Sequence, residues 1–247
     1  MKINLMKSLS IKSKDNIDSL DFYAKIEPLL GFYEAYDELY KKYLNLIESL
    51  KFENGDLALD FGCGNGKFSL LLSSKFKVLG LDISPKMAEI CSLKGIKTLV
   101  CPIDKLDMEF DLITAVSDVL NYMTQNELFK FFSSASNKLK PGGYLIFDLN
   151  TQFGFDSVAS GSLYIKDKNN DLIIDSNYEN KSLNTEFIYF EEQDNLYKKS
   201  KFEITQYHHS YKFIKDNCPL ELVKTMKIEL FSDSLADKEI YIFQKQT

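Results

Sequence analysis

One segment of this 247-residue sequence has residue types and spacing that favour binding of a small polar ligand. Gly62, Gly64 and Gly66 alternate with other residues directly after a short apolar run, and Cys63 lies between the first two. Glycine reaches positive φ angles and lets the backbone approach a ligand without a Cβ collision. A helix that starts here would also offer its unpaired N–H groups to a ligand carboxylate. We therefore predict a ligand-binding loop at this position.

Asp82 is a candidate for a second contact with the same ligand. It lies twenty residues after Gly62, at the end of the next apolar run, where a carboxylate can accept hydrogen bonds from two ribose hydroxyls. The dinucleotide fingerprint G-x-G-x-x-G would require a glycine at position 67, but Lys67 stands there. The spacing therefore disfavours a nucleotide-dependent oxidoreductase.

The pattern D-x-G-x-G-x-G, which begins at Asp60, resembles motif I of the class I, Rossmann-like S-adenosylmethionine-dependent methyltransferases. The resemblance extends over residues 55–152, where Pro141-Gly142-Gly143 resembles the family's turn into its fifth strand. It implies S-adenosylmethionine as cofactor and S-adenosylhomocysteine as product. Pro102 stands where the family often has an acid that contacts adenine, so we assign that contact to the backbone of Ile103. The cofactor-binding residues that the resemblance implies are Asp60, Gly62, Cys63, Gly64, Gly66, Asp82, Ile83, Met87 and Ile103. We add Ser117, after the predicted fourth strand, and Tyr23, which lies early enough in the chain to fold over the opening.

Short apolar runs that alternate with helical stretches must position these residues. Such alternation predicts an α/β fold with a parallel sheet covered by helices on both faces. With the resemblance, we expect a doubly wound, seven-stranded, mostly parallel sheet of strand order 3-2-1-4-5-7-6. The expected strands are 57–61, 77–81, 97–101, 111–116, 144–147, 225–231 and 239–244, and the expected helices between them are 67–74, 85–93 and 126–139.

The remaining residues divide into an N-terminal segment and an insertion. Residues 1–20 are polar and mixed, so we expect a loose lead-in there. In residues 21–50 the apolar residues recur at helical spacing, which predicts two helices with a break at Pro28 and Gly31. Period-2 runs at 172–178, 184–190 and 196–207 predict antiparallel hairpins. The expected organisation is an N-terminal helical lid segment at 1–50, a cofactor-binding core at 51–152 and 212–247, and an antiparallel β insertion at 153–211 that covers the active site.

Three residues are candidates for catalysis on the methyl-accepting side. Asp118 and Asp148 follow the predicted fourth and fifth strands, where an α/β sheet places its ligand crevice. Each could orient an amine or hydroxyl, or could cap the segment that follows. His208 is a candidate general base because histidine titrates near neutral pH; it could equally end a strand or face solvent. The aromatic residues near Tyr23 could likewise form a lid or pack in a core.

The amino-acid composition indicates which kinds of binding partner to expect. All 30 basic residues are lysine, against 36 acidic residues and a net charge of −6, which disfavours a nucleic-acid partner. Four scattered cysteines and two histidines favour reduced thiols and no metal site. The sequence shows no long apolar run and no signal peptide, so we expect a cytoplasmic protein without membrane contact, as monomer or homodimer.

The functional hypothesis is methyl transfer from S-adenosylmethionine to a small-molecule amine or hydroxyl. The sequence lacks the N-P-P-Y or D-P-P-Y tetrapeptide of methyltransferases that act on base or glutamine amino groups. The insertion after the predicted fifth strand resembles a bacterial small-molecule-type subgroup. Two alternatives stay open: a methyltransferase of tRNA or protein, and a non-catalytic S-adenosylmethionine-binding regulator.

Overall fold

A seven-stranded sheet forms the centre of the molecule. The computed structural model describes residues 11–31, 33–232 and 235–247. The sheet has the order β10-β11-β5-β4-β1-β2-β3; only the pairs that involve β11 are antiparallel. Numbered within this sheet, the order is 3-2-1-4-5-7-6, as predicted. Its strands are β1 (Leu57–Phe61), β2 (Lys77–Leu81), β3 (Lys97–Leu99), β4 (Phe110–Ala115), β5 (Leu139–Asn150), β10 (Glu221–Ile228) and β11 (Lys238–Gln244).

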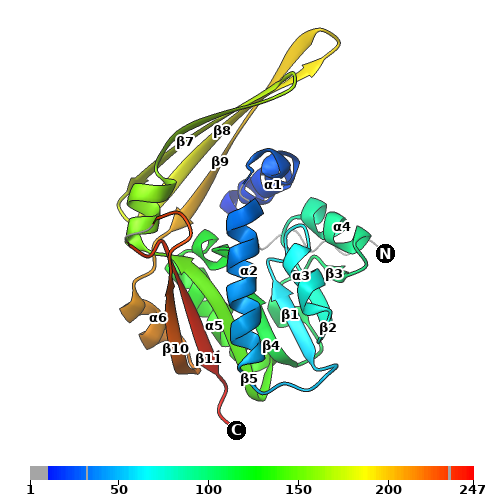
Figure 1. The fold of residues 1–247 in the computed structure, drawn as a ribbon, viewed down its shortest axis with the longest axis vertical. Helices are drawn as coiled ribbons and strands as arrows, with labels where there is room; N and C mark the ends of the chain where they lie inside the picture. Colours follow the sequence, from blue (N-terminus) through cyan, green and yellow to red (C-terminus); the bar gives the residue numbers. More distant parts are fainter. Residues whose placement is uncertain (1–10, 32, 233–234) are drawn as a thin grey trace.

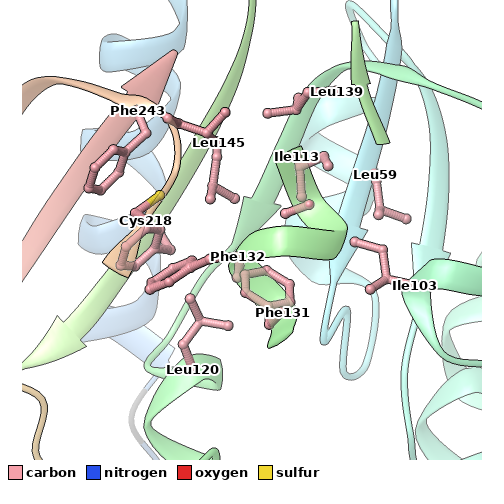
Figure 2. Packing of buried hydrophobic residues seen from close by; sticks show 14 of the residues in the cluster. Leu59, Ile103, Ile113, Leu120, Phe131, Phe132, Leu139, Leu145, Cys218 and Phe243 are labelled. Atoms are coloured by element: carbon pink, nitrogen blue, oxygen red, sulfur yellow. The ribbon is translucent and has the colours of Figure 1, made fainter. Parts of the chain in front are cut away.

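Helices cover both faces of this sheet, and the alternation of side chains along each strand decides which residue meets which layer. Ala58 packs with α2 (Tyr33–Glu48) and α3 (Lys67–Leu72), whereas its neighbour Leu59 packs with α5 (Gln125–Lys138) and α6 (Tyr211–Asn217). Figure 2 shows the second layer, where Phe131 and Phe132 of α5 lie against Leu59, Ile113 and Leu145 of the strands. Both faces are therefore buried, and the carboxyl edge of the sheet is left for a site.

Local signals in the sequence set the ends of the helices. Ser84 caps α4 (Pro85–Leu93) by accepting a hydrogen bond from the Met87 N–H, and Pro85 occupies the first helical position, as predicted. Thr124 and Glu127 form a capping box at the start of α5. Strand β5 begins at Leu139 and continues through Pro141-Gly142-Gly143, so it is longer than the predicted strand at 144–147.

A second, antiparallel sheet follows β5 in the chain. It has the order β6-β7-β8-β9, with β6 (Gly161–Asp167), β7 (Asn170–Glu179), β8 (Ser182–Gln193) and β9 (Leu196–Tyr207). The three predicted runs correspond to β7, β8 and β9, whereas β6 was not predicted. Figure 1 shows this sheet rising from one end of the main sheet, with α1 (Ile11–Ile26) beside β9.

The N-terminal segment differs in part from the prediction. Residues 11–20 belong to α1 and are not a loose lead-in, while residues 1–10 and 32 lie outside the described part. The physical reason is tertiary: Phe22 and Tyr23 of α1 pack on aromatic side chains of the second sheet, which no local pattern reveals. The predicted break between two helices at Pro28 and Gly31 is confirmed. The division of the chain into three domains stays a prediction.

No helix in the described part of the chain is long and apolar enough to cross a membrane.

Candidate active site

A cavity of about 1790 Å³ lies at the carboxyl ends of β1, β2, β4 and β5, between the main sheet and the second sheet. It brings together most of the residues that the sequence singled out. The predicted residues that line it are Tyr23, Asp60, Gly62, Cys63, Gly64, Asp82, Ile83, Met87, Ile103, Ser117 and Asp118. Gly66, Asp148 and His208 do not line it.

The glycine loop has the backbone that the sequence predicts, but its glycines face different surroundings. Gly62, Gly64 and Gly66 all have positive φ angles, of 69°, 51° and 79°. A Cβ at Gly62 would lie 2.4 Å from Val119, and one at Gly66 would lie 2.6 Å from the Cys91 sulfur. A Cβ at Gly64 would meet open space. Packing of the protein itself therefore requires Gly62 and Gly66, and only Gly64 leaves its side open to a ligand.

Asp82 holds this loop in addition to facing the cavity. Its Oδ2 accepts a hydrogen bond of 2.8 Å from the Gly64 N–H, and its Oδ1 accepts one of 2.9 Å from the Ser84 N–H. Burial raises the pKa of the Asp82 carboxyl, while these backbone donors oppose the rise. Each oxygen keeps a lone pair, so the carboxylate can still accept from ligand hydroxyls.

Asp60 is buried at the end of β1, where Ser69 Oγ and Thr114 Oγ1 donate to its two carboxylate oxygens. Burial raises the pKa of Asp60 to about 7, and these hydroxyl donors only partly offset that effect. The carboxyl therefore changes charge near neutral pH, next to the glycine loop.

The turn after β4 contains two successive left-handed residues, Ser117 (φ 68°) and Asp118 (φ 52°). Asp148 holds it: the N–H groups of Ser117 and Asp118 donate to its carboxylate over 2.7 and 2.9 Å. The Tyr43 hydroxyl of α2 donates to the same carboxylate over 2.7 Å. Asp148 is fully buried, so the structure places it behind the cavity wall and not at the predicted catalytic position.

Asp118 faces the cavity and connects three parts of the fold. Lys238 Nζ, at the start of β11, donates to its Oδ1 over 2.6 Å, and Gln206 Nε2, on β9, donates to its Oδ2 over 2.6 Å. Lys238 also donates to Asn150 Oδ1 over 2.7 Å and lies 3.4 Å from Asp148. Burial alone would lower the pKa of Lys238, but the carboxylates of Asp118 and Asp148 outweigh it and raise that pKa. This lysine is therefore a permanent cation under the site.

His208 lies away from these groups. Its ring packs edge-on against Phe155, and its backbone N–H donates to the backbone carbonyl of Lys181. Burial, with Lys181 as the second cause, lowers its pKa. The structure therefore does not bring this histidine to the cavity, and its observed contacts are those of a residue that ends a strand.

Four tyrosines line the cavity between the glycine loop and the second sheet: Tyr23, Tyr36, Tyr40 and Tyr122. Burial is the largest cause of a raised pKa in each of them, and it raises the pKa of Tyr36 to about 12. Their hydroxyls therefore stay protonated at neutral pH. They present aromatic surface and hydroxyl dipoles, and no phenolate base.

The segment around the end of α1 closes the side of the cavity near Asp82. Asp21 Oδ1 accepts hydrogen bonds from Ser84 Oγ (2.5 Å) and from the Lys86 N–H (3.1 Å), at the start of α4. Glu27 Oε1 accepts one of 2.6 Å from Asn65 of the glycine loop. Because Tyr23 also packs on Phe187 of β8, this segment joins the loop to the second sheet.

Comparison with known proteins agrees with this geometry. Residues 58–143, which include the glycine loop, Asp82 and the turn after β4, match the family model described as "Methyltransferase domain". This chain contains a methyltransferase domain. Its strand order is the one that the resemblance to class I, S-adenosylmethionine-dependent methyltransferases led us to expect.

Relatives extend the match to other parts of the chain. YqeM of Bacillus subtilis is 32% identical over 149 residues, which cover 54% of this chain and 60% of YqeM. An S-adenosylmethionine-dependent methyltransferase from Clostridium acetobutylicum superposes with a TM-score of 0.72 at 21% identity, over 93% of this chain and 98% of that one. The sugar N-methyltransferase KedS8 from Streptoalloteichus superposes with a TM-score of 0.68 at 13% identity, over 92% of both chains. The two structural matches share the fold with this chain.

The cavity in the methyltransferase domain suits S-adenosylmethionine chemically. The open side of Gly64 gives a ligand access to the loop, and Asp82 has acceptor capacity for ribose hydroxyls. Ile83, Met87 and Ile103 supply an apolar wall for a purine. Within the loop the N–H groups of Gly62, Cys63 and Gly66 already bond to carbonyls, so they are not the free donors that the sequence led us to expect.

Sequence reasoning missed Lys238, Gln206 and three of the four tyrosines as parts of the site. Lys238 and Gln206 reach Asp118 from strands that lie far from it in the sequence, so no local spacing could identify them. Tyr36 and Tyr40 belong to a row of aromatic residues along α2. Such a row predicts packing in a core as well as it predicts a place in a binding site. Tyr122 follows Asp118 closely in the chain and could have been inferred from that position.

Proposed function

We propose that this chain transfers a methyl group from S-adenosylmethionine to the nitrogen of a small-molecule amine. One observation carries the proposal: a single large cavity lies between the glycine loop and the second sheet, and Asp118 faces it. Such a volume is enough for a cofactor and a second small molecule. In this arrangement Asp60 and the Gly62–Gly66 loop hold the methionine part, and Asp82 holds the ribose.

Charge in the cavity favours a cationic acceptor. Among the described residues that line it, carboxylates outnumber lysines: Glu27, Asp60, Asp82, Asp104, Asp118, Glu127, Glu203 and Asp237 against Lys130, Lys201 and Lys238. A cleft lined mainly by one sign of charge concentrates ligands of the opposite sign. An ammonium ion therefore has an electrostatic reason to enter, and an anionic acceptor does not.

The available proton acceptors favour nitrogen over oxygen as the methylated atom. A hydroxyl needs a base in the transition state. The cavity tyrosines have raised pKa values and His208 lies elsewhere. Asp60 titrates near neutral pH, but both of its oxygens already accept hydrogen bonds from buried hydroxyls. An ammonium can release its proton to water and then attack as a free amine. The bound cofactor supplies an activated methyl group, and the chain aligns the nitrogen with it and excludes water.

Asp118 is our candidate for holding the acceptor nitrogen. Lys238 and Gln206 each donate to one oxygen of its carboxylate and so hold the side chain in one orientation toward the cavity. The printed name of KedS8, a sugar N-methyltransferase, supports nitrogen as the acceptor atom through the shared fold. A hydroxyl acceptor is the alternative that the test below separates.

The test begins with calorimetric titration of the full chain with S-adenosylmethionine, using NAD as the control ligand. We expect saturable binding of the first and none of the second. Pairs of small molecules that differ only in an amine or a hydroxyl are then screened for formation of S-adenosylhomocysteine. We expect turnover with amines, with Asp118→Asn raising KM at least tenfold and the exposed Asp156→Asn leaving it unchanged.

Other outcomes would redirect the proposal. Turnover with hydroxyl compounds alone would overturn the choice of nitrogen. Cofactor binding without turnover on any small molecule, RNA or protein substrate would instead identify a regulator that binds S-adenosylmethionine. Failure of the folded chain to bind the cofactor would remove the proposed function altogether.

A further inference from the structure

Two cysteines meet beneath the glycine loop. Cys63 belongs to the loop itself, and Cys91 lies on α4, which packs against the loop at Gly66. Together with Ile96 they form a small buried cluster of their own, separate from the main cores. Each thiol is the largest influence on the pKa of the other, which agrees with their shared place in this cluster.

Each of the two sulfur atoms lies close to a glycine residue. A Cβ at Gly80 of β2 would lie 3.0 Å from the Cys63 sulfur, and one at Gly66 would lie 2.6 Å from the Cys91 sulfur. Side chains at these two positions would therefore occupy the space that the sulfur atoms use. The absence of side chains there lets the loop and α4 approach each other closely enough for the thiols to touch.

The two thiols differ in reactivity and access. The hydrogen bond from Cys63, the largest cause, lowers the pKa of Cys91 to about 6, and Thr98 and Ser69 contribute in the same direction. The same contact raises the pKa of Cys63. Cys63 lines the cavity and is 7% exposed, whereas Cys91 is completely buried behind it. A small oxidant in the cofactor cavity therefore meets Cys63 first.

We propose that Cys63 and Cys91 are a modification site, a thiol pair that a hydroperoxide converts to a disulfide and that thereby disables the cofactor loop. The inference rests on the proposed function only in that S-adenosylmethionine is the ligand of this loop. The other described cysteines, Cys101 and Cys218, lie in or against a different cluster.

The chemistry balances with hydrogen peroxide as the oxidant. The Cys91 thiolate accepts the proton of Cys63, the thiol that faces the cavity. The Cys63 sulfur attacks one peroxide oxygen, the O–O bond breaks, and Cys63 becomes a sulfenic acid while hydroxide leaves. The Cys91 sulfur then attacks the Cys63 sulfur, the S–O bond breaks, and water leaves as Cys91 gives up its proton. Two thiols lose two electrons in total, and one peroxide is reduced to two water molecules.

The disulfide acts on the cofactor site through the loop backbone. A sulfur–sulfur bond is about 2.05 Å long, much shorter than any contact between two thiols. Bond formation therefore pulls Cys63 toward α4, although its N–H and that of Gly62 are bonded to the Leu81 carbonyl. The next residue, Gly64, is the one that donates to Asp82 and leaves its side open to the ligand. The loop must lose part of this geometry when the bond forms.

The experiment compares reduced and peroxide-treated full chain. Peptide mapping should find a Cys63–Cys91 disulfide, and calorimetry should show at least a tenfold loss of affinity for S-adenosylmethionine that a dithiol reductant restores. Saturation with S-adenosylmethionine before peroxide is added should slow formation of the bond at least fivefold, because the ligand fills the cavity that Cys63 lines.

Matched variants complete the test. Cys63→Ser should bind with the same affinity before and after peroxide, whereas Cys218→Ser should respond as the unmodified chain does. A mapped disulfide with unchanged affinity would overturn the proposal, as would peroxide treatment that oxidises Cys101 or Cys218 and leaves the pair reduced. If the reduced chain fails to bind S-adenosylmethionine, the proposed function fails, and mapping still reports on the thiol pair separately.

Discussion

Gly62, Gly64 and Gly66 share positive φ angles, yet a side chain would have a different effect at each of them. At Gly66 the space is taken by Cys91, and at Gly62 by Val119. At Gly64 the space is open toward the ligand. The motif therefore combines two packing requirements with one requirement for access, and these can be separated by mutation.

We expect Gly66→Ala and Gly64→Ala to affect different properties. Gly66→Ala combines a left-handed alanine with a collision at Cys91, which should cost about 2–5 kcal/mol of stability. Gly64→Ala has only the backbone cost, about 1–2 kcal/mol, but its methyl group enters the cavity and should weaken S-adenosylmethionine binding at least tenfold. Urea unfolding and calorimetry measure the two effects. Equal losses of stability in both variants would contradict this assignment.

The sequence predicted single residues best where the motif itself defines their neighbours. The positive φ angles of the loop glycines and the place of Asp82 beside the loop were predicted, because strand, turn and helix are local, whereas the packing around Gly62 and Gly66 was not. Asp148 was predicted as a catalytic group, but it supports the turn after β4, since its donors come from α2 and from residues 117–118. A carboxylate at a strand end looks the same in sequence whether it faces a cavity or a backbone turn.

Among the elements, β11 contributes most to the site through one side chain. Lys238 is 5% exposed and pairs with Asp118 and Asp148, which makes it the counter-charge of two carboxylates. Removing one partner of a buried ion pair leaves an uncompensated charge in a poorly solvated place. The start of β11 therefore stabilises the turn after β4.

We expect Lys238→Met to destabilise the protein by about 3–5 kcal/mol, because two carboxylates lose their cation. The measurement is urea unfolding at neutral pH. Lys86→Met, which removes an exposed pair with Glu89 on α4, is the control and should leave the unfolding curve unchanged. If Lys238→Met unfolds like the control, Lys238 is not the counter-charge that we describe.

Helices and strands were predicted correctly where their apolar residues recur at a regular spacing and where they contact segments nearby in the sequence. Strands β1, β2 and β9 and helix α4 have the predicted bounds. The first ten residues of helix α1, strand β6 and helix α6 were not predicted. Contacts with other segments accompany two of them: α1 packs on β9, and β6 pairs with β7. Local propensity says little about such elements.

In the whole molecule, α1 connects the second sheet to the cofactor loop. Phe187 of β8 stacks on Phe202 of β9 with ring centroids 4.6 Å apart, and Tyr23 of α1 packs edge-on against it. Lys25 of the same helix pairs with Glu191 over 2.6 Å. The second sheet and the N-terminal segment therefore form one layer over the cavity.

We expect Phe187→Ala to loosen this layer and leave the main sheet intact. Loss of a buried aromatic side chain costs about 3–5 kcal/mol where the surroundings cannot collapse. Hydrogen exchange should therefore increase in residues 19–30 and in β9, with β1 and β4 unchanged. Leu196→Ala, at a position that is 74% exposed on the same sheet, is the control. Equal exchange in both variants would contradict the connection.

The segment that matches the methyltransferase family ends at residue 143, but the wall of the cavity does not. Tyr23, Tyr36, Asn150, Gln206 and Lys238 all lie outside it, in parts of the chain that are far apart in sequence. In the proposed function, the matched segment carries the residues that meet the methyl donor together with Asp118, while the surrounding segments supply the rest of the wall around the acceptor. Two relatives can therefore agree closely over that segment and still accept different molecules, so exchanging the surrounding segments should transfer acceptor choice between them.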